Sequence, residues 1–357
     1  MGAAPKLDEA KRDAFADRLV RDIAGTYATA MVTVGDRLGL FKDLAARGPA
    51  TSDELAARTG LAERYLREWL HGLAAAGYLE RDPKGDRYAL PPEHAPALAD
   101  EGGSRFLGGL YQKLPAEIAV LDRVIEAFRA GGGVPQAAYL AEEWDGLDRL
   151  STVWFEHQLL QEWLPRMPDV RARLERGARV ADLGCGRGRA LVKLAQAFPR
   201  GTYVGYDVFP PTVAAATANA EMAGVVDRAR FEVLDAARGL PESFDVITTF
   251  DVVHDAADPL ALLRAIRAAL RPGGIYVCLD VNAGESPDDN AGPIGTWLYG
   301  ASLLYCMTTS LAAGGAGLGT LGLPESRLRA LCAEAGFGEV RRVPMDNLFN
   351  SLYEICP

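Results

Sequence analysis

The chain has 357 residues, of which 49% are hydrophobic and 24% are charged, with 38 Lys and Arg against 48 Asp and Glu. This composition is typical of a globular protein with a sizeable core and room for more than one domain. The net charge of -10 disfavours general binding to nucleic acid backbones or to anionic lipid surfaces, because like charges repel.

The N-terminal third predicts a winged-helix domain. Apolar residues at helical spacing predict a helix over 7–45, and the capping sequence at 51–54 predicts a short helix after it. A second helix is expected over 62–77, followed by two short strands around a turn at 82–86. Helix, turn, helix and hairpin in this order form the winged-helix pattern, which serves either DNA binding or dimerisation.

The charge of this region favours dimerisation over DNA binding. Residues 51–90 contain seven acids and six bases, so no positive surface is evident, and a DNA-reading module would normally be clearly basic. We expect residues 1–95 to form a helical arm and a winged-helix dimerisation domain, without nucleic acid as a partner. Residues 96–170 are expected to form a helical linker.

Three further features bear on location. The five cysteines include no C-x-x-C pair, so we expect reduced thiols and no zinc-binding pattern. The first 20 residues lack the apolar segment of a signal peptide, so we expect a cytoplasmic protein. Residues 291–324 carry no charge, but Gly, Pro and hydroxyl residues interrupt them. We therefore expect a helical cap at about 285–323, without a membrane span.

Beyond the linker, strand-like and helix-like segments alternate, which predicts a parallel sheet with helices on both faces over 171–357. Ligands of such sheets bind beyond the carboxyl ends of the strands. The segments with strand character are 178–184, 202–208, 229–236, 244–253 and 274–281.

The first of these strands runs into the sequence D-L-G-C-G-R-G at 182–188. Its glycines allow the backbone to turn tightly and to approach a ligand, and the following helix presents free N–H groups there. The dinucleotide fingerprint would need a glycine at Arg189, so that interpretation fails. Asp182 suits a ligand with a cationic amino group better than a pyrophosphate.

The next strands also end in acids. Asp207 is placed to accept hydrogen bonds from ribose hydroxyls, and Asp235 is placed for an adenine amino group. The fourth strand ends in the sequence F-D-V-V-H-D at 250–255, and the turn R-P-G-G at 271–274 precedes the fifth strand.

These features together resemble a class I S-adenosylmethionine (SAM)-dependent methyltransferase: D-x-G-x-G-x-G, an acid after each of the next two strands, and P-G-G before the fifth. The resemblance implies an α/β, Rossmann-like domain with a mixed, mostly parallel seven-stranded sheet, preceded by the winged-helix domain. It implies SAM as cofactor and S-adenosylhomocysteine (SAH) as product. The expected cofactor-binding residues are Asp182, Gly184, Gly186, Gly188, Asp207, Asp235 and Phe250.

The whole arrangement resembles the small-molecule O-methyltransferases of caffeate type and their bacterial relatives. The stretches 290–311 and 335–350 are most similar to an actinobacterial subgroup. The resemblance implies a homodimer that methylates a small, natural-product-like acceptor of secondary metabolism, with the linker contributing to the acceptor pocket. The candidate acceptor-binding residues are Trp154, Glu156, His157, Trp297, Tyr305 and Asn350.

His254 follows the fourth strand in V-V-H-D-A-A-D-P, which is similar to the H-D-W-S-D of these enzymes, whose His is the general base. An imidazole with an unperturbed pKa near 6.5 can take a hydroxyl proton during methyl transfer. A structural role for His254 is the alternative. Ala256 stands where the family has Trp. We also place Asp255 in the catalytic set, although it could instead cap the helix that begins near Asp258.

Two other functions stay open. Related C-methyltransferases of 2-oxo acids bind a metal through a His-Asp pair here and a distant second His. This chain lacks that His, and Cys306 or Asn282 would have to replace it, so we expect no metal. The second alternative is a SAM-sensing transcriptional regulator that uses the winged helix on DNA.

Overall fold

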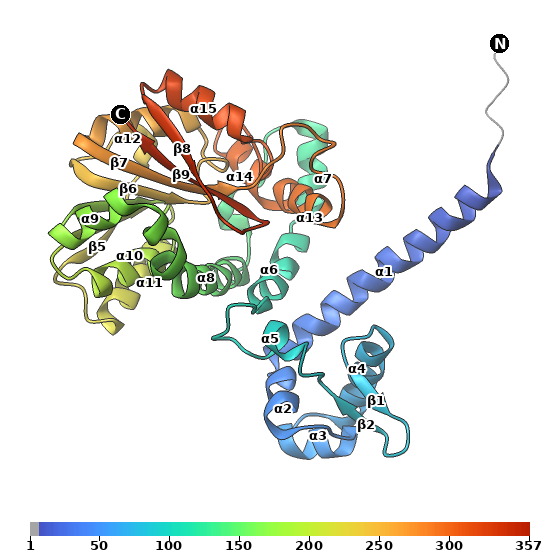
Figure 1. Cartoon of the computed structure of the whole chain (residues 1–357). Coiled ribbons are helices and arrows are strands. Elements are labelled where there is room, and N and C mark those ends of the chain that lie inside the picture. Colours follow the sequence, from blue (N-terminus) through green and yellow to red (C-terminus); the bar gives the residue numbers. More distant parts are fainter. Residues whose placement is uncertain (1–6) are drawn as a thin grey trace, which may run out of the picture. The chain divides into compact units, whose positions relative to one another are not determined.

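The computed structural model describes residues 7–357, which divide into two compact units (Figure 1). The first unit contains the residues up to Pro115 together with Asp145–Leu150, and the second contains Ala116–Trp144 and Ser151–Pro357. The expected linker over 96–170 is therefore shared between the two units. Residues 1–6 lie outside the described residues. They belong to the expected helical arm and to the segment in which no signal-peptide pattern was expected.

The first unit has the element order of a winged helix. A capping box begins α3, because the Thr51 side chain accepts the Glu54 N–H and the Glu54 carboxylate accepts the Thr51 N–H. Leu55, Leu70 and Tyr88 from three elements share one buried core. The elements are α1 (Glu9–Arg37), α2 (Leu40–Arg47), α3 (Ser52–Thr59), α4 (Glu63–Ala75), β1 (Glu80–Asp82), β2 (Arg87–Ala89) and α5 (Ala95–Leu98); α6 (Gly108–Ile118) crosses the unit boundary.

The prediction of one continuous helix over 7–45 is wrong at one point. The structure ends α1 at Arg37 and begins α2 at Leu40, with Gly39 between them at a φ of 69°. A left-handed residue cannot continue a right-handed helix, and glycine adopts this conformation without steric strain.

The second unit confirms the mixed, mostly parallel seven-stranded sheet, with strand order β5-β4-β3-β6-β7-β9-β8. β5, β4, β3, β6 and β7 run parallel, and β9 is antiparallel to both β7 and β8. The strands are β3 (Arg179–Leu183), β4 (Thr202–Asp207), β5 (Ala229–Val233), β6 (Phe244–Phe250), β7 (Leu270–Val281), β8 (Glu339–Val343) and β9 (Asn350–Cys356). The turn expected at 271–274 lies inside β7, as an irregularity in its pairing with β6.

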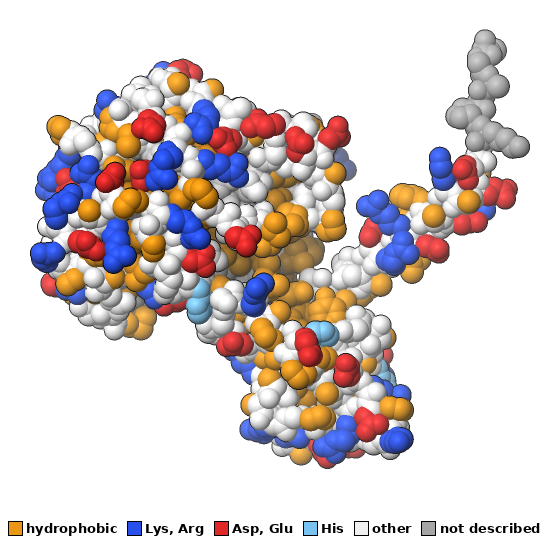
Figure 2. Space-filling model, in the orientation of Figure 1, with side chains coloured by type: hydrophobic (Ala, Val, Ile, Leu, Met, Phe, Trp, Pro, Cys, Tyr) orange, Lys and Arg blue, Asp and Glu red, His pale blue; other side chains and the backbone are white. Residues whose placement is uncertain are grey.

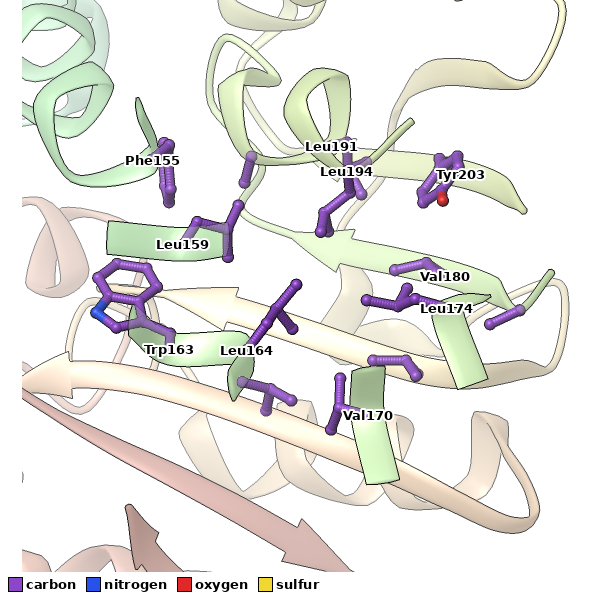
Figure 3. Close-up of a cluster of buried hydrophobic side chains, with 14 of the residues drawn as sticks. Phe155, Leu159, Trp163, Leu164, Val170, Leu174, Val180, Leu191, Leu194 and Tyr203 are labelled. Carbon is purple, nitrogen blue, oxygen red and sulfur yellow. The ribbon is translucent and has the colours of Figure 1, made fainter. Parts of the chain in front are cut away.

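Helices cover both faces of this sheet because successive strand residues point to opposite sides. Val180 belongs to the core cluster on one face and Ala181 to the cluster on the other. Figure 3 shows the first cluster, in which α9 and α10 pack on the strands. The helices of this unit up to β8 are α7 (Leu121–Ala130), α8 (Glu142–Trp154), α9 (Pro168–Arg176), α10 (Arg189–Ala197), α11 (Pro210–Met222), α12 (Pro259–Ala269), α13 (Pro293–Ala301), α14 (Met307–Ala312) and α15 (Glu325–Glu334). The middle of α8, Asp145–Leu150, belongs to the first unit.

Within residues 7–357, five short helical segments have 3-10 or π geometry instead of α geometry. The helix expected to run on past α8 changes to π geometry in η2 (Phe155–Trp163) and ends in η3 (Leu164–Arg166). A second π segment, η5 (Ser302–Cys306), lies within the expected cap between α13 and α14. The two remaining turns are η1 (Gln136–Ala138) and η4 (Ala236–Arg238). Along residues 7–357, no helix combines the length and the hydropathy that a bilayer span requires.

Candidate active site

The glycine-rich loop after β3 is shaped to approach a ligand. Gly184, Gly186 and Gly188 have φ values of 65°, 51° and 73°, all in the left-handed region. The Gly186 N–H donates to Oδ2 of Asp207 over 2.9 Å, which fastens the loop to the end of β4. A Cβ added at Gly186 would meet no protein atom within 4 Å, so this part of the loop borders open space.

Two acidic side chains lie beside this loop. Asp182 is buried and accepts a hydrogen bond from the Thr248 hydroxyl over 2.6 Å. Burial, together with the charge of Asp207, raises the pKa of Asp182 to about 7, against the opposing effect of that hydrogen bond. Burial also raises the pKa of Asp207, although its carboxylate accepts the N–H groups of Phe209 and Gly186.

Neighbouring buried carboxylates of this kind are stabilised by a cation. SAM carries a positive amino group and a positive sulfonium, so the acids and the open loop fit this cofactor.

Asp235 and Phe250 already have structural contacts. The Asp235 carboxylate caps η4 by accepting the Ala237 N–H over 3.1 Å, and it pairs with Arg238. The Phe250 ring lies edge-on to Phe155, with centroids 5.1 Å apart. Neither contact tests a role toward the cofactor, so both roles stay predictions.

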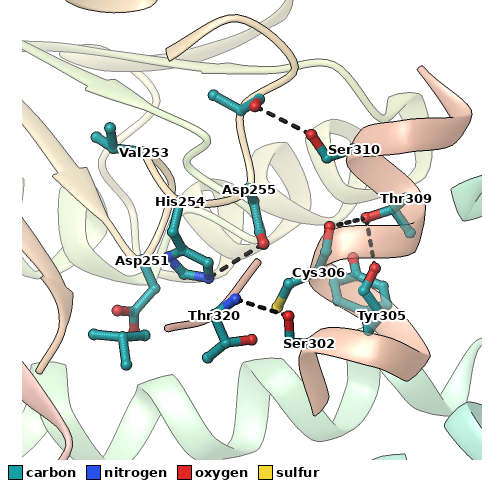
Figure 4. Close-up of polar contacts among 12 residues, drawn as sticks. Asp251, Val253, His254, Asp255, Ser302, Tyr305, Cys306, Thr309, Ser310 and Thr320 are labelled. Carbon is teal, nitrogen blue, oxygen red and sulfur yellow. Dashed lines mark hydrogen bonds and ion pairs between the residues drawn. The ribbon is translucent and has the colours of Figure 1, made fainter. Parts of the chain in front are cut away.

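His254 lies at the carboxyl end of the sheet between two carboxylates. Its side chain is 3% exposed, and its Nδ1 atom lies 2.6 Å from Oδ1 of Asp280, a residue that is 2% exposed at the end of β7. Its Nε2 atom forms an ion pair with Oδ1 of Asp255 at 3.2 Å (Figure 4). The other oxygen of Asp280 accepts the Val253 N–H, which fixes the carboxylate.

The protonation of His254 follows from these contacts. Burial alone would lower its pKa, but the charges of Asp255 and Asp280 outweigh burial and raise the pKa well above its usual value. Each ring nitrogen of His254 faces one carboxylate, and it can donate a hydrogen bond to that carboxylate only when it carries a proton. The unperturbed pKa near 6.5 expected from the sequence does not apply in this arrangement.

Asp251 and Asn350 extend the same cluster. Asp251 has a φ of 55°, and its Oδ1 atom accepts a hydrogen bond from Nδ2 of Asn350 over 2.6 Å. Burial, followed by the charge of Asp280, raises the pKa of Asp251 to about 8. Asn350 is positioned by strand pairing, because it stands opposite Val281 in the antiparallel β7–β9 register.

The cap brings two further side chains to the cluster. Figure 4 shows that Tyr305 and Cys306 of η5 lie beside the loop that carries His254 and Asp255. Ligating atoms of His254, Asp255 and Cys306 lie within 4.8 Å of one another, as do those of Asp251, His254 and Asp280. Cys306 is therefore placed as the metal alternative requires. Asn282 instead accepts hydrogen bonds from Ser351 and Arg342.

Two of the expected acceptor-binding residues belong to the His254 cluster, and the other four have surroundings elsewhere in the fold. Tyr305 and Asn350 belong to the His254 cluster. Glu156 is exposed and pairs with Lys193 of α10, so its carboxylate has a different partner. Trp154 packs against the core cluster of Figure 3, Trp297 lies edge-on to Phe349 at 5.5 Å, and His157 is half-buried on η2.

Sequence reasoning missed Asp280 and Asp251. A signal was present for Asp280, because it is an acid at the carboxyl end of the fifth strand, and that strand was expected to lie in the same sheet. Asp251 directly follows β6, whereas the strand expected over 244–253 would have contained it.

Comparisons with known proteins agree with this geometry. Residues 181–276 match the family described as a methyltransferase domain, and residues 26–100 match the Rv2258c-like winged HTH domain. The ubiquinone biosynthesis O-methyltransferase of Cereibacter sphaeroides is 36% identical over 106 residues, which are 30% of this chain. The match covers 42% of that relative, less than half of its length.

Solved structures share the fold over nearly the whole chain. The mitomycin 7-O-methyltransferase MmcR is 22% identical with a TM-score of 0.66, and the match covers 98% of this chain and 99% of that one. The O-methyltransferase NcsB1 from neocarzinostatin biosynthesis is 22% identical with a TM-score of 0.64, covering 95% and 98%. Residues 181–276 thus match a methyltransferase domain, residues 26–100 match a winged-helix domain, and the whole chain shares its fold with solved O-methyltransferases.

Proposed function

We propose that this protein transfers a methyl group from SAM to an oxygen atom of a small-molecule acceptor of natural-product type. The observation that carries the proposal is the pairing of His254 with Asp280 at the carboxyl end of the sheet that also holds the glycine-rich loop. The NcsB1 structure, which contains SAH and 1,4-dihydroxy-2-naphthoic acid, supports a hydroxylated acceptor by analogy of fold.

The cofactor roles follow the residues around the loop. In this proposal, Asp182 binds the amino group of SAM, and the methionine part of SAM lies along Gly184, Gly186 and Gly188. Asp207 would hold the ribose, while Asp235 and Phe250 would lie toward the adenine. Bound SAM supplies a methyl group made electrophilic by its sulfonium. The protein contributes position and exclusion of water, which account for most of the rate.

In the proposed mechanism, Asp280 keeps the proton on Nδ1 of His254 and fixes the ring. Nε2 then points to the acceptor hydroxyl, and Asp255 takes the ring proton from Nε2 before the hydroxyl binds there. The free Nε2 accepts the hydroxyl proton as the oxygen attacks. Proton transfer of this kind contributes about 10²–10⁴-fold to a rate.

The test is the His254→Ala variant. SAH release from SAM and an acceptor should fall by about 10²-fold or more, because the proton acceptor is lost. Calorimetric affinity for SAH should stay within a factor of two or so, because His254 does not touch the cofactor residues in the proposal. The exposed His71→Gln variant in the first unit is the matched control. Unchanged turnover of His254→Ala would refute the base role.

A homodimer is part of the proposal, because α1 exposes an apolar stripe of Leu19, Ile23 and Tyr27; Figure 2 shows hydrophobic side chains exposed among charged ones along this helix. Leu19, Ile23 and Tyr27 recur every four residues on one helix face and are 47%, 58% and 69% exposed. Exposed apolar side chains that share one helix face mark an interaction site, and a second copy of the winged-helix domain would cover them.

Metal-assisted C-methylation of an enolisable 2-oxo acid is the second candidate, supported by the close approach of His254, Asp255 and Cys306. Imidazole, carboxylate and thiolate together suit a divalent transition metal. Metal content of the purified protein separates the two candidates. A stoichiometric metal that is required for turnover would favour C-methylation.

The regulator alternative has weaker support. A shallow hollow of about 530 Å³ beside β1 and β2 is lined by four arginines, but each of them has an acidic partner. The ion pairs are Arg47–Asp43, Arg58–Asp43, Arg81–Asp86 and Arg87–Glu54. Paired arginines offer little net charge to phosphates. A gel shift with genomic fragments tests this alternative directly.

A further inference from the structure

The charges around His254 are mainly negative. Asp251 from the end of β6, Asp280 from the end of β7 and Asp255 from the loop after β6 surround this one imidazole. His254 and Asp280 are buried, whereas the Asp255 side chain is 31% exposed, so solvent screens the field around the imidazole only in part. A ligand at Nε2 of His254 therefore meets two carboxylates, Asp255 and Asp280, against one imidazole charge.

Carboxylates also act on the cap side of the site. Tyr305 is buried, and after burial itself the charges that raise the pKa of its hydroxyl come first from Asp255 and then from Glu143 of α8. Glu143 is fully buried and also acts on Tyr139, whose ring lies edge-on to Tyr305 at 5.1 Å. Two carboxylates, Glu143 and Asp255, thus disfavour negative charge at the cap tyrosine.

An independent observation concerns hydrogen bonding. Asn350 is 3% exposed, and its Nδ2 atom donates to Asp251. Within the described residues 7–357, its Oδ1 atom has no hydrogen-bond partner. A buried amide oxygen without a partner is costly, and only a donor can satisfy it. The edge of the cluster therefore requires a donor that the protein does not supply.

We propose that the acceptor is an uncharged or cationic compound with a second hydrogen-bond donor, a hydroxyl or an amine, beside the oxygen that is methylated. The second donor pairs with Oδ1 of Asn350, and the reacting hydroxyl faces His254. A carboxylate in the place of that donor is repelled, because Asp255 and Asp280 outnumber the one positive charge that His254 can carry and leave the site a net negative charge. This inference rests on the proposed function, and it excludes 2-oxo acids as substrates.

Matched probes test the inference on the SAH-loaded protein in the presence of EDTA. Catechol and 2-aminophenol carry the second donor, whereas salicylate carries a carboxylate in its place. Calorimetry at pH 7.5 should give catechol at least about tenfold tighter binding than salicylate. In Asp255→Asn this ratio should shrink several-fold. Asp258→Asn, at an exposed helix cap three residues further on, should leave the ratio unchanged.

Each outcome decides the matter. Tighter binding of salicylate, or no measurable preference, including no binding of either probe, would overturn the inference. A preference that Asp258→Asn reduces as much as Asp255→Asn would also overturn it. SAH affinity measured on the same sample distinguishes failure of the proposed function from failure of the acceptor class. Lost SAH binding refutes the proposed function, whereas normal SAH binding without a probe preference refutes only the acceptor class.

Discussion

The Nδ1 atom of His254 lies 2.6 Å from Oδ1 of Asp280, which joins the ends of two adjacent parallel strands, β6 and β7. Asp280→Asn should keep the shape of this contact but place an amide where the proton acceptor was. The ring then tends to carry its proton on Nε2, the atom that faces the acceptor. Turnover should fall about 10–10³-fold, with SAH affinity unchanged. A steady-state assay with parallel calorimetry checks this prediction, and equal losses of both quantities would contradict it.

The pH dependence of the rate should reveal the neighbours of His254. Its pKa is raised by Asp255 and Asp280, so the basic form appears only above that raised pKa and activity is lost as the pH falls. Asp255→Asn removes one of the two charges and should shift the rising limb of the kcat/KM profile to lower pH. An unmoved limb would show that His254 is not the titrating base.

Cofactor affinity should also depend on pH. The pKa of Asp182 is about 7, so below pH 7 its carboxyl is increasingly neutral and holds the amino group of SAH less well. Affinity should fall as the pH drops, by at most about tenfold per pH unit for one proton. Calorimetry from pH 5.5 to 8.5 measures this slope. Asp182→Asn should flatten this slope. Adenosine lacks the homocysteine part of SAH and its α-amino group, so its affinity for the unaltered protein should show no such slope.

Trp144 of α8 should support the cofactor site without touching the glycine-rich loop. Its ring stacks on Phe209 with centroids 4.5 Å apart, and the Phe209 N–H donates to Asp207 over 2.9 Å. Trp144→Ala should loosen this turn and weaken SAH binding several-fold, whereas Trp144→Phe should retain most of the affinity. If the alanine variant loses thermal stability but keeps the SAH affinity of the unaltered protein, the ring is purely structural.

The apolar stripe of α1 should hold the dimer together. Ile23→Glu places a charge in the middle of the stripe and should convert the dimer to a monomer in light scattering. Arg21→Glu changes the charge on the opposite face of the same helix and should leave the dimer intact. Equal effects of the two variants would argue against an interface at this stripe.

The sequence predicted the features that depend on neighbouring residues. The glycine-rich loop, Asp207 at the end of β4 and the five parallel strands follow from local patterns, whereas the resemblance implied the full seven-stranded sheet; the structure contains all of these features. His254 was visible for the same reason, because its position after β6 depends only on where that strand ends.

The features that depend on distant pairing or on irregular geometry were not predicted. The partnership of His254 with Asp280 joins residues 26 positions apart and depends on strand register. The π geometry from Phe155 onward adds a residue to each turn and changes the directions of the side chains that follow. Helical spacing therefore did not place Glu156, which pairs with Lys193.

The most direct test of the account is calorimetric titration of SAH into Gly186→Ala and Gly224→Ala. Both glycines are left-handed, with φ values of 51° and 67°, and an added Cβ meets no protein atom within 4 Å at either one. Each substitution should therefore cost about 1–2 kcal/mol of folding free energy. We predict that Gly186→Ala loses SAH affinity at least about tenfold, because its methyl group enters the cofactor position, while Gly224→Ala binds normally. Equal SAH affinity in the two variants, or no SAH binding by the unaltered protein, would contradict the assignment of this loop to the cofactor.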